Sequence, residues 1–149
     1  MRGRRSDGKT AVNTARKIFH ARQSMGPTVR GPALVASDGF SARYDLDRNT
    51  GVFSRPSHKL AGQSYTGKIL VLDTAKGGVA TAWMLHEMQS RGVVPLALVF
   101  NSVNPIIVQG AALGDVPILA GFDEDITKAI HNGAEVEVNG QRGVLTVVD

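Results

Sequence analysis

The sequence contains no cysteine among its 149 residues. This absence excludes a disulfide within the chain, and it excludes thiolate ligands for zinc or for an iron–sulfur cluster. Any such centre would have to be held by another chain. The four histidines, His20, His58, His86 and His131, show no metal-ligand spacing, and none stands beside a serine–aspartate pair. The sequence therefore predicts that this chain binds no metal by itself.

Long apolar runs are also missing. No run approaches the roughly 20 residues that span a bilayer, and the N-terminus lacks the apolar centre of a secretory signal. We therefore expect a cytoplasmic protein without a membrane partner. With 42% hydrophobic and 20% charged residues, a chain of this length favours one globular domain that can bury a core.

Acidic residues are scarce near the N-terminus. Residues 1–30 contain eight Lys and Arg against one Asp, a charge of +7, whereas residues 31–149 contain nine basic and twelve acidic residues, a charge of −3. We expect a basic, flexible N-terminal extension over residues 1–30 and a folded domain over residues 31–149. A short helix over residues 10–23 is an alternative for part of the extension. A basic arm can bind nucleic acid, but a solvated extension is the simpler interpretation, so nucleic acid is not expected as a partner.

The body of the chain has strand-like and helical segments in alternation. Apolar runs of strand length lie at residues 33–36, 69–72, 95–100 and 116–119. Helical spacing begins at Val79 and stops at Gly92, and a smaller helix is predicted over residues 124–131. Alternating strands and helices predict a small parallel α/β core built from right-handed crossovers.

The C-terminal part predicts antiparallel strands. Residues 135–138 alternate strictly between acidic and apolar side chains, and residues 143–148 form a partner strand. Asn139-Gly140 between them predicts a tight hairpin turn. The fold class is therefore α/β, with a mixed sheet, β-rich ends and a parallel middle.

The central stretch from Lys68 to Met88 has the order strand, glycine turn, helix. The backbone N–H groups at the start of the helix point into the turn that contains Gly77 and Gly78, where they can hold an anion. Close packing of strand and helix explains the two glycines equally well. The position favours a site, because open α/β sheets bind ligands at the carboxyl ends of their strands. Thr81, one turn into the helix, would add a hydroxyl.

Two further side chains are candidates for a site. Ser41 stands at a turn-to-strand edge, followed by Asp45 and Asp47, which are typical of turns and also arise as metal ligands. His58 lies in an irregular, glycine-flanked stretch, and it is the histidine that we retain as a candidate. His131 is explained by a helix C-terminus.

Several short motifs occur in a fixed order. They are Gly31-x-Ala33-Leu34-Val35, then Ser41 followed by Asp47 and Thr50-Gly51, then His58-x-Leu60-x-Gly62-Gln63-Ser64, then Gly67 to Leu72 and the glycine turn. This series resembles the small subunit, or swivel domain, of aconitase X. The likeness covers roughly residues 31–119, and the order of the motifs gives it its specificity.

The resemblance implies a swivelling β/β/α domain over residues 31–149 that closes over a larger catalytic subunit. That partner would supply the cysteines for an iron–sulfur cluster. The implied activity is that of a hydro-lyase subunit, active only with the large subunit. It would remove water from a small hydroxy acid such as cis-3-hydroxy-L-proline or mevalonate 5-phosphate. A serine of the swivel domain is the expected proton-abstracting base, which assigns that role to Ser41, and Gly77, Gly78, Thr81 and His58 are the expected substrate-binding residues.

The glycine turn departs from the family. Gly77-Gly78-Val79 replaces a Gly-Ser-Ser/Thr turn, so the two glycines would contribute only backbone N–H groups and Thr81 would supply the hydroxyl. The segment from Gly77 to Ala82 is also similar to the mobile phosphohistidine domains of phosphoenolpyruvate-utilising enzymes, which need a histidine where Ala82 or a neighbour stands. The alternative function is therefore a non-catalytic swivel or adaptor domain that has lost phosphotransfer.

Overall fold

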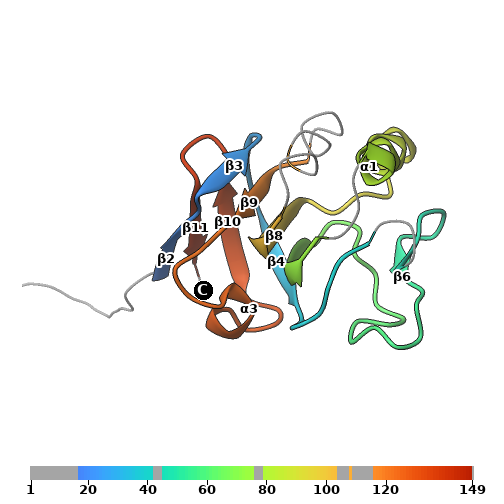
Figure 1. Cartoon of the computed structure of the whole chain (residues 1–149), viewed down its shortest axis with the longest axis horizontal. Helices are drawn as coiled ribbons and strands as arrows, with labels where there is room; N and C mark the ends of the chain where they lie inside the picture. The colour runs from blue at the N-terminus through green and yellow to red at the C-terminus, as the bar shows by residue number, and fades with distance from the viewer. Residues whose placement is uncertain (1–16, 42–44, 76–78, 104–107, 109–115, 149) are drawn as a thin grey trace, which may run out of the picture.

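The computed structural model describes residues 17–41, 45–75, 79–103, 108 and 116–148 (Figure 1). Among the described residues, the helices with defined bounds are α1 (Val79–Arg91) and α3 (Ile126–Ala129). A small two-stranded sheet pairs β5 (Leu46–Asp47) with β6 (Val52–Phe53). The main sheet comprises β2 (Lys17–His20), β3 (Gln23–Met25), β4 (Thr28–Val35), β7 (Ile69–Thr74), β8 (Ala97–Ser102), β9 (Ile118–Ala120), β10 (Glu135–Asn139) and β11 (Val144–Val147).

The main sheet is mixed, with a parallel centre. Its strand order is β2-β11-β10-β4-β7-β8-β9-β3. Strands β4, β7, β8 and β9 run parallel, whereas β10, β11, β2 and β3 each pair antiparallel with a neighbour. The central runs Ile69–Leu72 and Ala97–Phe100 have no exposed surface, as expected for parallel strands covered on both faces. The predicted mixed sheet with a small parallel core is confirmed.

Two clusters of apolar side chains cover the two faces of the parallel strands. On one face, Leu70, Leu72 and Phe100 pack with Met88 of α1 and with Tyr65. On the other face, the apolar side chains of β7 and β8 pack with those of α3, β10 and β11. Because consecutive residues of a strand point to opposite faces, the unbroken apolar runs supply both clusters at once.

One bent segment joins the two ends of the main sheet. Strands β2 and β3 stand at opposite ends of the strand order, yet only Ala21 and Arg22 separate them in sequence (Figure 1). The N–H of Ala21 donates to the carbonyl of Gly143 (2.8 Å), and the N–H of Arg22 donates to that of Ala120 (3.0 Å). The sheet therefore curls until its first and last strands are held by one short piece of chain.

We call residues 17–25, which form β2 and β3, the closing segment. Because they are part of the sheet, the domain boundary expected at residue 31 is wrong. Residues 17–30 form β2, β3 and the first part of β4, so they belong to the sheet, and the helix expected over residues 10–23 is wrong for residues 17–23. The positive charge was misleading because the side chains of Arg22 and Arg30 point outward, where they meet Asp123 (2.6 Å) and Glu135 (3.2 Å). Residues 1–16 lie outside the described residues.

The connection between β10 and β11 is longer than the predicted tight turn. Strand β10 ends at Asn139 and β11 begins at Val144. The N–H of Gly143 donates to the carbonyl of Asn139 (2.9 Å). The side-chain oxygen of Asn139 accepts the N–H groups of Gln141 and Arg142. A Cβ on Gly140 would lie 2.2 Å from the carbonyl oxygen of Met25. Gly140 therefore permits close packing of this connection on β3.

The closing segment predicts different results for two truncations. Removal of residues 1–16 leaves every described strand in place, and we expect a free energy of unfolding within about 1 kcal/mol of the full chain. Removal of residues 1–25 takes away β2 and β3 and exposes the edges of β9 and β11, so we expect loss of the cooperative transition and aggregation. Urea denaturation followed by circular dichroism measures both. Cooperative, unchanged unfolding of the shorter chain would show that the closure is dispensable.

Candidate functional site

The backbone after β4 continues alongside the end of β7 as far as Phe40, the residue before Ser41. After β4 the chain continues along β7: the N–H of Phe40 donates to the carbonyl of Thr74 (2.8 Å), and Phe40 and Ala75 form a parallel bridge. Ser41 follows one member of this bridge, and residues 76–78 follow the other. Ser41 therefore lies at the carboxyl edge of the parallel strands, where α/β sheets bind ligands.

Three of the predicted site residues lie wholly or partly outside the described part of the structure. Gly77 and Gly78 lie outside the described residues, and so does the side chain of Thr81. The backbone places Thr81 in the first turn of α1, which begins at Val79. The predictions for these three residues therefore stay predictions.

Ser41 opens a short turn that a buried carboxylate closes. The N–H of Ser41 donates to Oδ2 of Asp45 (2.9 Å), and the N–H of Asp45 donates back to the carbonyl of Ser41 (2.9 Å). Ser41 is partly exposed, whereas only 4% of Asp45 is exposed. The backbone at Ser41 is thus tied to a charged group in the interior.

An arginine neutralises the buried carboxylate. Arg55 Nε donates to Oδ1 of Asp45 (2.5 Å), and the same guanidinium lies 3.7 Å from Oδ1 of Asp38 and donates to Oγ of Ser57 (2.7 Å). A buried charge is costly unless it is paired and hydrogen-bonded. Here both oxygens of Asp45 are used, one by Arg55 and the other by the backbone of Ser41.

His58 lies beneath the loop that leads to Ser41. Its side chain has no exposed surface, and its ring stacks on Phe53 with 4.6 Å between the ring centroids. Nδ1 accepts the N–H of Leu60 (3.0 Å), so the proton is on Nε2, which donates to the carbonyl of Gly39 (2.8 Å). Substrate contact was predicted for His58, but both ring nitrogens bind backbone groups. Its influence on the site passes through Gly39.

Asp38 fixes the same loop from the other side. Its Oδ1 accepts the N–H of Gly39 (2.8 Å) and its Oδ2 accepts the N–H of Lys59 (3.0 Å). Burial raises the pKa of Asp38, but the hydrogen bonds from Lys59 and Gly39 outweigh this effect, so the pKa lies below its ordinary value of 3.8. The charge of Arg55 acts in the same direction. Asp38 is therefore a charged anchor for the loop.

Sequence reasoning treated Asp45 and Asp47 alike, and the structure separates them. Asp47 is a turn residue, whose Oδ1 accepts the N–H groups of Asn49 (2.9 Å) and Thr50 (3.2 Å). Asp45 is instead the partner of Arg55, which was not predicted as a site residue. No local pattern marks that pair, since ten residues of turn and short strand separate its members.

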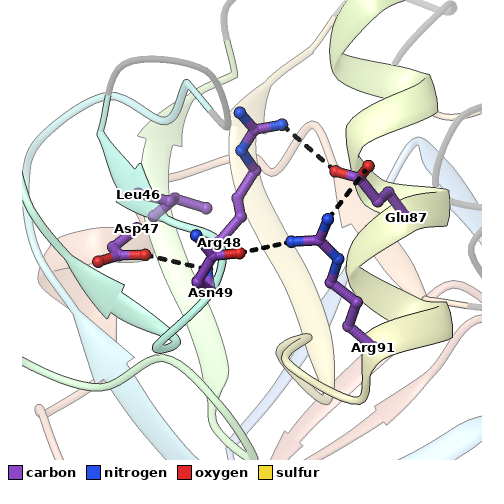
Figure 2. Close-up of a pocket in the computed structure, with 6 residues that line it drawn as sticks. All are labelled: Leu46, Asp47, Arg48, Asn49, Glu87 and Arg91. Carbon is purple, nitrogen blue, oxygen red and sulfur yellow. Dashed lines mark hydrogen bonds and ion pairs between the residues drawn. The ribbon is translucent and has the colours of Figure 1, made fainter.

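A polar pocket that Ser41 does not line lies between the β5–β6 connection and the end of α1. It has a volume of about 370 Å³ and is lined by Leu46, Asp47, Arg48, Asn49, Glu87 and Arg91. Figure 2 shows the guanidinium groups of Arg48 and Arg91 directed at Glu87, at 3.7 and 3.6 Å. Two arginines and two acids cancel in charge, so this pocket does not favour an anion. The Arg48–Glu87 ion pair and the hydrogen bond from Arg91 to Asn49 attach the β5–β6 connection to α1.

The described residues offer no metal site. Among them, no group of three or more histidine, aspartate or glutamate side chains is placed to hold a metal ion. Iron–sulfur clusters are held mainly by cysteine thiolates, and the chain has no cysteine, so its residues do not fit such a cluster. Within the same described residues, no helix is long and apolar enough to cross a membrane.

Comparison with known proteins identifies the family. Residues 18–147 match the family described as the aconitase X swivel domain. The chain belongs to this family. The match begins one residue after the start of β2, which agrees with the closing segment being part of the domain.

Relatives of this aconitase X swivel domain and solved structures align with most of the chain. The phosphomevalonate dehydratase small subunit of Methanothrix thermoacetophila is 31% identical over 83% of this chain and 90% of the relative. That of Methanopyrus kandleri is 34% identical over 74% and 82%. The holo-form structure of Thermococcus kodakaraensis aconitase X superposes with a TM-score of 0.82 at 23% identity, covering 89% of this chain and 99% of that one. A solution structure of a UPF0107 protein gives 0.79 at 27%, over 89% and 100%. The predicted swivel fold is confirmed.

Asp38 gives the domain a defined dependence of stability on pH. Its folded pKa is depressed, so its stabilising contribution is present above the ordinary pKa of about 3.8 and is lost as pH falls through the folded value. At pH 7 we expect Asp38→Asn to lower the free energy of unfolding by about 1 kcal/mol. The difference from wild type should shrink below pH 4. Urea denaturation between pH 7 and pH 2.5 measures it, and a constant difference would exclude Asp38 as the charged anchor.

Proposed function

We propose that this chain is the small subunit of an aconitase X-type hydro-lyase that dehydrates mevalonate 5-phosphate together with a large subunit. The observation that carries the proposal is the place of Ser41 at the carboxyl ends of the parallel strands β4 and β7, directly after the bridge between Phe40 and Ala75. Relatives named phosphomevalonate dehydratase small subunit, matched over most of their length, support the substrate and the partner.

The proposed reaction needs a base on one carbon and departure of a hydroxyl from the next. Ser41, as its alkoxide, takes the proton, the electrons of the C–H bond form the double bond, and the C–O bond breaks to release hydroxide. Transfer of the proton from Ser41 to that hydroxide gives water and restores the alkoxide. A bound iron–sulfur cluster would supply a Lewis acid for that hydroxyl. We assign the cluster to the partner, because this chain has no cysteine. No further step of this chain depends on it.

The other proposed site residues belong to the start of α1. The positive end of a helix and its unpaired N–H groups attract anions, so Gly77, Gly78 and Thr81 are suited to bind a negatively charged substrate group. The family match favours this function over the adaptor alternative, in which Ala82 stands where phosphotransfer needs a histidine.

Substitution of Ser41 tests the catalytic proposal in the complex reconstituted with the large subunit. We expect Ser41→Ala to lower kcat at least about a hundredfold, as for loss of a general base, and to leave assembly unchanged by size-exclusion chromatography. The matched control is Ser90→Ala, since the Ser90 hydroxyl lies on exposed α1 and donates to the carbonyl of Glu87 (2.8 Å). Turnover equal to wild type in Ser41→Ala would remove Ser41 from the mechanism and favour the adaptor alternative.

The choice of substrate has its own test. We expect the wild-type complex to dehydrate mevalonate 5-phosphate, with no turnover of cis-3-hydroxy-L-proline at equal concentration, because a phosphate suits the helix start and hydroxyproline lacks one. Mass spectrometry of the product, showing loss of one water, measures both reactions. Faster loss of water from hydroxyproline would overturn the proposed substrate while leaving the hydro-lyase proposal in place.

A further inference from the structure

An ion pair between a buried carboxylate and a partly exposed guanidinium adjoins the backbone of Ser41 and is not used by the proposed chemistry. Asp45 is 4% exposed, and its carboxylate accepts from Arg55 through Oδ1 and from the N–H of Ser41 through Oδ2. Buried ion pairs are weak contributors to net stability, because desolvation offsets much of their attraction. A role in fixing geometry accounts for this pair better than a role in stability.

The direction of the contacts supports that role. Asp45 binds both backbone groups of Ser41: its carboxylate accepts the N–H of Ser41, and its own N–H donates to the carbonyl of Ser41. Arg55 is in turn held by the carboxylate of Asp38 (3.7 Å) and by Ser57. The guanidinium thus connects the turn after Ser41 with the loop before it, as a planar group with several fixed donors is suited to do.

A second contact fixes the chain two residues before Ser41. His58 donates to the carbonyl of Gly39, and its ring is held by the N–H of Leu60 and by stacking on Phe53. Between these points, Phe40 is fully buried and paired with β7. The backbone on both sides of Ser41 is therefore fixed from one segment, residues 55–60.

We infer that Asp45, held by Arg55, is a positioning residue that sets the place of the Ser41 hydroxyl for proton abstraction, with His58 as a second support. This inference rests on the proposed function of Ser41. Asp45 acts through its hydrogen bonds to the backbone of Ser41, Arg55 acts through Asp45, and His58 acts through the carbonyl of Gly39. Their effect should appear in kcat, because a displacement of about 1 Å at a reacting group lowers the rate by roughly a hundredfold.

The first test is Asp45→Asn in the reconstituted complex, which retains an oxygen for the Ser41 N–H and loses the charge that holds Arg55. We expect kcat to fall by about tenfold to a hundredfold, with KM and assembly unchanged. The matched control is Asp47→Asn, two residues away, whose carboxylate accepts N–H groups of its own turn and which should keep wild-type kcat. Equal kcat for Asp45→Asn and wild type overturns the inference.

A double-mutant cycle separates positioning from a general structural role. In the Ser41→Ala complex we expect Asp45→Asn to cause no further loss of the residual turnover, because its effect passes through Ser41. A further loss of the same size in that background would show a structural role and overturn the inference. If Ser41→Ala itself keeps full turnover, the proposed function fails first, and the two failures are thereby distinguished.

A second variant covers failure of Asp45→Asn to fold. Arg55→Lys keeps the charge on a side chain that is 35% exposed, and it loses the planar fork, so the complex should assemble and show a kcat at least about fivefold lower. Hydrogen exchange of the peptide over residues 39–45 should be faster than in wild type and unchanged in Asp47→Asn. Normal kcat with normal exchange in Arg55→Lys overturns the inference.

Discussion

The parallel pairing of β4 with β7 does not stop where β4 ends, and the site depends on its continuation. The N–H of Ala36 donates to Val71 (3.1 Å), and that of Asp73 donates to Asp38 (2.8 Å), so the loop after β4 is drawn along the last residues of β7. Phe40 completes this run, with its ring 5.7 Å from that of Phe100. A buried aromatic side chain and a strand-like backbone thus bring Ser41 to the carboxyl edge of the sheet.

The segment between β5 and β7 acts as a second scaffold for the same edge. It has little regular structure, but it contains buried Phe53, Leu60 and Tyr65, which pack into the core on the α1 side. Its polar groups bind the loop of Ser41, and at its start the Arg48–Glu87 ion pair and a hydrogen bond between Arg91 and Asn49 attach it to α1. An irregular segment can hold such a loop because many of its described backbone groups are paired, some through short turns and others across the segment.

The sequence predicted the elements whose patterns are local and missed those that depend on distant pairing. The buried runs of β7 and β8 are apolar because both faces are covered, and α1 ends where Gly92 adopts a φ of 73°. Strands β2 and β3 have no such pattern. They are short and exposed or half-buried, and the paired residues are 124–130 positions apart for β2 and β11 and 93–97 positions apart for β3 and β9. Tertiary pairing, which local propensity does not encode, forms them.

The candidate site divides in the same way. The place of Ser41 at the carboxyl edge of the sheet followed from two parallel strands that end together, whereas the prediction for the glycine turn concerns residues outside the described ranges. The roles of Asp45 and His58 did not follow, because burial decides them: an aspartate in a turn and one paired with Arg55 look alike in sequence. His58 was singled out for its irregular surroundings, and those surroundings enclose the ring completely.

A site completed between two chains places a particular demand on the smaller one. In the proposed complex, the partner carries the cluster and this chain carries the base, so closure of the domain brings Ser41 to the substrate as part of a rigid body. Movement of this loop relative to the sheet would make the position of Ser41 less precise after the domain closes on the partner. Charged and aromatic contacts that fix the backbone before and after Ser41 remove that freedom before the partner binds, and the conformational entropy is lost during folding of this chain.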